Sequence, residues 1–120
     1  MAKIIKIPTF SDERGDLSVI EKLVNFSFKR IYYIYNSDGS QRGGHRHKKT
    51  RQLLVCIHGS CDIFCENKFE EVVFSLNSPK KCLLLEAEDW HTMSNFSKNC
   101  ILLVMASEYY DIDDYIDEKY

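Results

Sequence analysis

The sequence contains no apolar run near the roughly 20 residues that an α-helix needs to cross a bilayer, so no membrane partner is expected. It has no CxxC pair, and its five cysteines are an odd number, which argues against a disulfide framework. Its 16 basic residues are balanced by 18 acidic ones, for a formal net charge of −2, so no overall charge attracts nucleic acid. Residues 1–6 alternate charge and hydrophobe, which is typical of a strand and not of a secretory signal. These absences predict a cytoplasmic protein.

What is present indicates one folded domain over residues 1–120. The 44% hydrophobic and 28% charged residues are typical of a globular chain. The dominant hydrophobic period is two, and short segments rich in β-branched and aromatic residues alternate with turn signals. The expected strands are Lys3–Ile7, Leu17–Leu23, Arg30–Tyr35, Gln52–His58, Cys61–Cys65, Glu70–Leu76, Lys81–Leu85 and Cys100–Ala106. This pattern predicts an all-β sandwich or jelly-roll barrel. The acidic segment 109–120 is expected to be a solvated tail or a short helix that packs its aromatic residues on the barrel.

Three of the four histidines lie in two short motifs. His45 and His47 are two residues apart, and since residues i and i+2 of a strand face the same side, both rings should project from one wall. Gln52 follows five residues after His47, and His91 stands in Trp90-His91-Thr92-Met93. The arrangement resembles the two cupin motifs, with Gln52 where metal-binding cupins place glutamate. The resemblance implies a cupin jelly-roll barrel.

Gln52 bears on whether a metal is used. A cupin metal centre adds a carboxylate to three imidazoles, and a neutral amide is a poorer ligand for a divalent first-row metal. Three histidines alone can hold zinc, so a metal-dependent cupin enzyme stays open as an alternative. Without a metal, two imidazoles that face one cavity suit acid–base chemistry, because histidine titrates near physiological pH.

Longer runs carry a closer resemblance, from about residue 14 to the C-terminus. They are Arg30-Ile31-Tyr32-Tyr33-Ile34, Arg42-Gly43-Gly44-His45-Arg46-His47-Lys48, Trp90-His91 with Met93, Cys100 to Ser107, and Asp114-Tyr115-Ile116. These runs resemble the sugar nucleotide 3,4-ketoisomerases of the cupin superfamily. The resemblance implies a homodimer that exchanges N-terminal strands, needs no cofactor and acts on dTDP-4-keto-6-deoxy-D-glucose in a deoxysugar pathway toward amino sugars of surface glycans. A sugar nucleotide-binding module that leaves its ligand unchanged is the non-catalytic alternative.

The implied chemistry is proton abstraction α to a carbonyl: a base removes the C3 proton, an enediol forms across C3 and C4, and a proton returns to C4. By the resemblance, His45 and His47 are the acid–base pair. His47 is preferred as the base for carbon-bound protons, and the reverse order stays open. Tyr33 is expected to relay a proton, and Arg42 to stabilise developing oxyanion charge or bind phosphate.

The expected substrate-binding residues are Arg14, Gly15, Arg30, Lys48, Gln52, Trp90, His91 and Met93. Within this set, Arg30 and Lys48 are candidates for contact with pyrophosphate. The pair Arg14-Gly15 resembles family members that form the galacto-configured product, dTDP-3-keto-6-deoxy-D-galactose. The gluco-configured product, dTDP-3-keto-6-deoxy-D-glucose, is the alternative.

Overall fold

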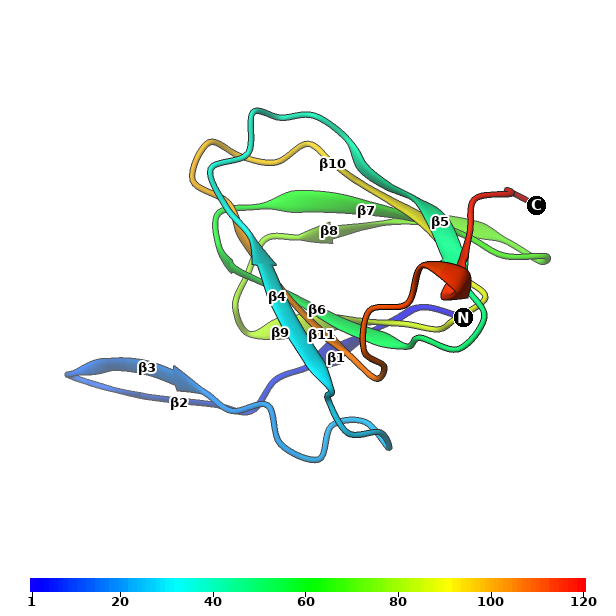
Figure 1. The fold of residues 1–120 in the computed structure, drawn as a ribbon. Helices are drawn as coiled ribbons and strands as arrows, with labels where there is room; N and C mark the ends of the chain where they lie inside the picture. Colours follow the sequence, from blue (N-terminus) through cyan, green and yellow to red (C-terminus); the bar gives the residue numbers. More distant parts are fainter.

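Two five-stranded antiparallel sheets face each other and form a barrel, and a long hairpin projects from it (Figure 1). The structure is a computed structural model that describes residues 1–120. Its strands are β1 (Lys3–Lys6), β2 (Thr9–Asp12), β3 (Gly15–Ser18), β4 (Arg30–Ile34), β5 (Arg42–His47), β6 (Gln52–His58), β7 (Cys61–Glu66), β8 (Glu71–Leu76), β9 (Lys81–Leu85), β10 (Trp90–Ser94), β11 (Ile101–Ala106) and β12 (Tyr115–Ile116). One short 3₁₀ helix covers Ile112–Asp114, and no helix is long and apolar enough to span a membrane.

The strand order shows how distant segments come together. The first sheet runs β1-β9-β6-β11-β4 and the second β12-β5-β10-β7-β8, so most neighbours in a sheet are not consecutive in the chain. This is the connectivity of a jelly roll. The prediction of an all-β jelly-roll barrel is confirmed.

Burial explains why some strands alternate between apolar and polar residues and others are apolar throughout. The barrel interior is filled by alternate residues of both sheets, including Leu54, Ile63 and Leu102. The outer face of the first sheet is also covered, because residues 19–28 pack across it. Strand β6 is buried on both faces and therefore reads as a continuous apolar run, as strands covered on both faces do.

One predicted strand is mostly wrong. Leu17–Leu23 leaves the sheet after Ser18, and its apolar side chains, Ile20 and Leu23, join Phe26 and Phe28 against the first sheet. A segment that covers a sheet is as hydrophobic as a strand, so composition did not separate the two. The acidic C-terminal segment also differs from the expectation, because after its short 3₁₀ helix it adds a strand, β12, to the second sheet beside β5.

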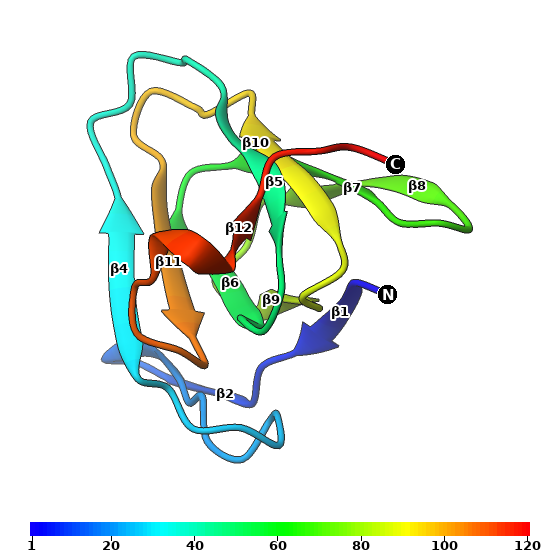
Figure 2. The same cartoon turned by 45° about the vertical axis from the view of Figure 1, so that its right-hand side comes forward.

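The N-terminal elements differ in where they pair. Strand β1 pairs with β9 of the same chain, from Lys3 opposite Leu84 to Lys6 opposite Lys81. Strands β2 and β3 pair only with each other, and the hairpin they form extends away from the barrel (Figures 1 and 2). The hairpin, and not β1, is therefore the N-terminal element that extends away from the barrel of its own chain.

Candidate active site

Three imidazoles gather inside one end of the barrel. His45 and His47 project inward from β5, and His91 projects from β10, where it lies opposite His45 in the register. The ring centroids of His45 and His47 are 5.1 Å apart, and that of His91 lies 5.1 Å from His45 and 6.2 Å from His47. The strand alternation that brings the two β5 rings together sends Arg46 outward, where its guanidinium lies over the Tyr120 ring.

His47 is held by a buried carboxylate from the C-terminal segment. Its Nδ1 lies 2.9 Å from Asp114 Oδ2, so the Nδ1–H donates to the carboxylate and Nε2 keeps its lone pair. Nε2 is buried and has no hydrogen-bond partner. Asp114 also accepts the Lys49 backbone N–H at 2.7 Å and the Thr50 hydroxyl. This network orients the His47 ring and selects its tautomer.

His45, by contrast, lines the open cavity of the site. The cavity has a volume of about 330 Å³ and is lined by Arg30, Tyr32, Ile34, Arg42, Gly43, His45, Met93, Tyr110 and Tyr115. Two arginines therefore face the same space as one imidazole and several phenol rings. Arg30 stacks over the rings of Tyr32 and Tyr110, and its buried Nε has no partner. The arrangement combines a base, proton donors and fixed positive charge around one pocket.

The tyrosine in the cavity is Tyr32 and not Tyr33. Tyr33 lies on the outer face of β4, is 60% exposed and packs beside Tyr35, so it does not line the cavity of its own chain as predicted. The Tyr32 hydroxyl accepts a hydrogen bond from Gln52 Nε2 at 3.2 Å, which leaves its own proton free to donate. Gln52 is itself buried and touches the cavity only through Tyr32, so a direct contact with substrate is not supported for it.

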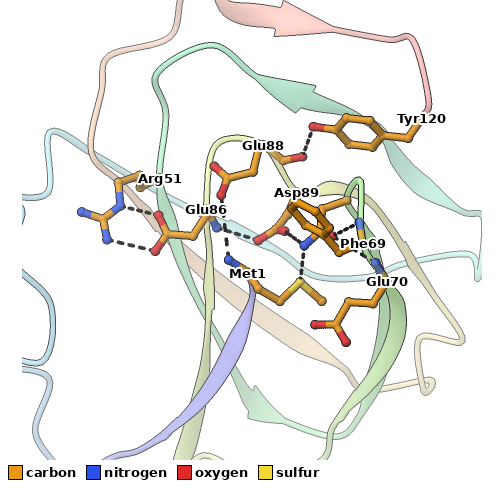
Figure 3. Close-up of polar contacts among 9 residues, drawn as sticks. Met1, Arg51, Phe69, Glu70, Glu86, Glu88, Asp89 and Tyr120 are labelled. Carbon is orange, nitrogen blue, oxygen red and sulfur yellow. Dashed lines mark hydrogen bonds and ion pairs between the residues drawn. The ribbon is translucent and has the colours of Figure 1, made fainter.

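The turn that precedes β10 orients the His91 ring through a hydrogen bond. Its Nδ1 lies 3.1 Å from the Asp89 carbonyl oxygen, so this nitrogen carries a proton and donates it. The Asp89 carboxylate accepts the backbone N–H of Glu86 at 3.0 Å, and the Glu86 carboxylate pairs with Arg51 (Figure 3). The N-terminal amine of Met1 lies 3.8 Å from the carboxylate of Glu88 in the same turn.

Burial sets the protonation of the three histidines. It lowers the pKa of His91 to about 3. Burial also lowers the pKa of His45, and the neighbouring His47 adds to the effect. For His47, burial lowers the pKa more than the Asp114 carboxylate raises it. All three rings are therefore neutral at pH 7, which is the form a general base requires.

Several other predicted binding residues lie outside the cavity. The Trp90 ring is on the outer face of β10, where its Nε1 donates to the Asp117 carbonyl at 3.1 Å, so it does not line the cavity as predicted. Lys48 lies at a neighbouring hollow beside Tyr109 and Asp114. Arg14 and Gly15 are at the tip of the projecting hairpin, where Arg14 pairs with Asp12, and they do not reach the site of their own chain.

The side chains present do not fit a cupin metal centre. The three imidazoles do not bring their nitrogens to one point, since the only convergent group of at least three potential ligands consists of cysteines elsewhere in the barrel. Hydrogen bonds at Nδ1 of His47 and Nδ1 of His91 leave only their Nε2 atoms for a metal, and these do not converge with a nitrogen of His45. The amide of Gln52 is directed to Tyr32. The geometry therefore does not support the metal-dependent alternative.

Reasoning from the sequence missed Asp114, Tyr110 and Tyr115 as parts of the site. The Tyr115 ring lies 4.6 Å from both His45 and His47 between centroids. All three belong to the acidic C-terminal segment, which was expected to be a solvated tail or a short helix packed on the barrel. A signal was present, because tyrosine and isoleucine residues interrupt the acidic run and give the segment apolar side chains to pack.

Comparison with known proteins identifies relatives along the whole chain. The family described as FdtA, WxcM-like, C-terminal matches residues 1–120. A TDP-4-oxo-6-deoxy-alpha-D-glucose-3,4-oxoisomerase from Aneurinibacillus thermoaerophilus is 43% identical over 119 residues, which is 95% of this chain and 84% of the relative.

Two solved structures share the fold closely. A variant of the 3,4-ketoisomerase QdtA from Thermoanaerobacterium thermosaccharolyticum, in complex with TDP-4-keto-6-deoxyglucose, is 40% identical with a TM-score of 0.92, covering 98% of this chain and 87% of that one. WlaRB, a TDP-quinovose 3,4-ketoisomerase from Campylobacter jejuni, is 38% identical with a TM-score of 0.92, covering 98% and 92%.

Proposed function

Since the chain belongs to the FdtA family (WxcM-like, C-terminal) and is a TDP-sugar 3,4-ketoisomerase, we propose that it converts dTDP-4-keto-6-deoxy-D-glucose to dTDP-3-keto-6-deoxy-D-galactose. The substrate is supported by the QdtA variant, whose structure contains the same 4-keto sugar nucleotide. The observation that carries the mechanism is the cavity in which a neutral His45 faces Tyr32 and two arginines.

In this proposal His45 is the base that removes the C3 proton. It lines the cavity, whereas His47 is only 4% exposed and lies behind it. The order of the two histidines is thus the reverse of the one preferred from the sequence. The Tyr32 hydroxyl, which accepts from Gln52, donates its proton to the C4 oxygen as the enediol forms. A proton then returns to C4 while the C3 hydroxyl loses its own.

His47 is the second member of the acid–base pair. With Nδ1–H committed to Asp114, its Nε2 can take a proton from His45 or from a hydroxyl group, and the carboxylate stabilises the imidazolium that results. Arg30 and Arg42 place positive charge at the cavity, where it stabilises an enediolate oxygen or holds the pyrophosphate. No step requires a cofactor, and the reaction needs only proton transfer.

We further propose a homodimer to which the hairpin contributes. The hairpin exposes Phe10 and Leu17, and the outer face of β4 exposes Ile31 and Tyr33. Burial of such apolar surface against a second copy would remove it from water. The free thiols of the cysteines agree with a cytoplasmic location, where thiols stay reduced. Sedimentation of the purified protein tests the dimer.

The galacto configuration is proposed from Arg14-Gly15 at the hairpin tip. In its own chain the tip is remote from the cavity, so it can influence the product only at the site of a second subunit. The gluco-configured product is the alternative, since WlaRB is a TDP-quinovose 3,4-ketoisomerase. The coupling between H4 and H5 of the product distinguishes the two configurations.

The decisive experiment is proton NMR of the purified protein with dTDP-4-keto-6-deoxyglucose in the presence of a chelator. Signals of a 3-keto sugar are expected in ordinary water, and a parallel reaction in deuterated water reports which carbon exchanges. A His45→Asn variant should give no product. Unchanged substrate with the wild-type protein, followed by turnover when a divalent metal is added back, would establish the metal-dependent reading instead. Binding without turnover in either condition would establish the binding module.

A further inference from the structure

Three cysteine side chains converge inside the barrel, away from the cavity lined by His45. Cys56 lies near the end of β6, Cys61 begins β7, and Cys100 directly precedes β11. Their sulfur atoms all lie within 4.8 Å of one another. Cys56 Sγ is 3.5 Å from Cys100 Sγ. Sulfurs that share one ion at the roughly 2.3 Å of a metal–thiolate bond lie roughly 3.8 Å apart, so small side-chain rotations would let all three bind one ion.

The cluster is dry and tightly enclosed. The exposed fractions of Cys56, Cys61 and Cys100 are 0%, 1% and 2%, within the apolar core of the barrel. The turn after β6 packs directly on the chain before β11, because a Cβ on Gly59 would lie 2.3 Å from Ser97 Oγ and 3.0 Å from Cys100 Cα. This close approach brings the thiols of the two segments together.

The thiols differ in acidity. Hydrogen bonds from Cys61 and Cys100 lower the pKa of Cys56 to about 7. The bond to Cys56, together with burial, raises the pKa of Cys61. Burial raises the pKa of Cys100 to about 11. The three thiols are therefore not equivalent, and burial disfavours the accumulation of uncompensated negative charge among them.

Charge selects among the soft ions that sulfur prefers. Three thiolates leave a net charge of −2 with a monovalent ion and −1 with a divalent ion. The core around the three sulfurs consists of hydrophobic residues, with no cationic side chain to balance either charge. Burial of an unbalanced charge is costly. A trivalent ion gives a neutral complex, and trivalent arsenic needs three donors and no fourth ligand. Sulfur ligands favour soft ions.

We propose that Cys56, Cys61 and Cys100 form a three-sulfur binding site for a trivalent thiophilic ion, with arsenite as its probe. Arsenous acid, As(OH)₃, exchanges its three As–O bonds for three As–S bonds. Each thiol gives its proton to a departing hydroxide, so three waters leave and nothing is oxidised or reduced. Entry requires local opening of the turn at residues 58–60, which lies at the protein surface.

Native mass spectrometry of the intact protein with arsenite tests the proposal. One ion per chain is expected, with the mass of arsenic added and three hydrogens lost. The melting temperature should rise with arsenite concentration, because the fold holds the three thiols together and so binds the ion more tightly than the unfolded chain does. The Cys100→Ala variant should lose both effects. The matched control is Cys82→Ala, which removes an equally buried thiol outside the cluster and should retain them.

Three results would overturn the proposal. The first is an adduct that keeps one oxygen and loses only one hydrogen, which would mean two sulfurs and not three. The second is an equal loss of binding in Cys82→Ala. The third is stoichiometric retention of Zn²⁺ in preference to arsenite, which would refute the charge argument. The mass of the wild-type adduct decides the number of sulfurs even if the Cys100→Ala variant does not fold. None of these results bears on the isomerase activity, since none of the three cysteines lines its cavity.

Discussion

Replacement of Asp114 by asparagine tests how the site controls His47. Oδ2 of Asp114 accepts from His47 Nδ1 at 2.9 Å and from the Thr50 hydroxyl, while Oδ1 accepts the Lys49 N–H at 2.7 Å. An asparagine has a single oxygen, so in either orientation its NH₂ group faces at least one of these donors. The unsatisfied donors should cost about 1–3 kcal/mol of stability, and the melting temperature should fall by several degrees.

The effect on catalysis should be larger than the effect on binding. When the NH₂ group faces His47, the ring is driven to the tautomer with a proton on Nε2 and can no longer accept a proton from the cavity. In the other orientation the amide oxygen accepts from Nδ1–H, but a neutral amide no longer stabilises the imidazolium as the carboxylate does. Loss of a positioned general base typically costs roughly 10²–10⁴-fold in rate, so kcat should fall by this order. KM should change little, because Asp114 does not line the cavity beside His45.

The pH profile separates positioning from mere folding. The Asp114 carboxylate raises the pKa of His47 against the effect of burial, so its removal should lower that pKa further. The acid limb of the Asp114→Asn profile should therefore move to lower pH. Asp113→Asn is the matched control, since Asp113 is the exposed neighbour in the same 3₁₀ helix. Wild-type kcat and an unmoved acid limb in Asp114→Asn, measured by NMR on folded protein, would refute the reasoning.

Three further predictions can be checked with the same protein. Tyr32→Phe should lower kcat because the hydroxyl in the cavity is lost, whereas Tyr33→Phe on the exposed face should retain the wild-type rate; the opposite ranking would restore the role first predicted for Tyr33. His91 is neutral in the fold with a pKa of about 3 and titrates near 6.5 when unfolded, so the unfolded state binds more protons below pH 6.5. Stability should then fall as the pH drops below 6.5, by up to about 1.4 kcal/mol per pH unit for this group, as denaturant titration can measure; a His91→Gln variant should lose that part of the slope. Gly43→Ala should destabilise the site, because its φ is +85° and a Cβ would lie 2.8 Å from the His91 carbonyl oxygen; an unchanged melting temperature would contradict the close packing of β5 on β10.

The sequence alone determined the fold class and the family. A hydrophobic period of two, repeated over many short segments, is typical of strands whatever their order, although the segment Leu17–Leu23 shows that a stretch packed on a sheet can carry a similar pattern. The same alternation placed His45 and His47 on one wall, and the structure has both rings inside the barrel. The motifs predicted the family of sugar nucleotide 3,4-ketoisomerases, which the comparisons confirm.

Only the tertiary structure decided which faces and which distant residues form the site. Alternation shows that Tyr32 and Tyr33 point to opposite sides, but both faces of β4 carry apolar residues, so the inward side followed only from its pairing with β11. Asp114 is 67 residues from His47, and no local pattern links a carboxylate to an imidazole over that separation. Cys56 and Cys100 are 44 residues apart and meet because β6 and β11 are neighbours in the sheet. Contacts of this kind depend on strand order, which local periodicity does not encode.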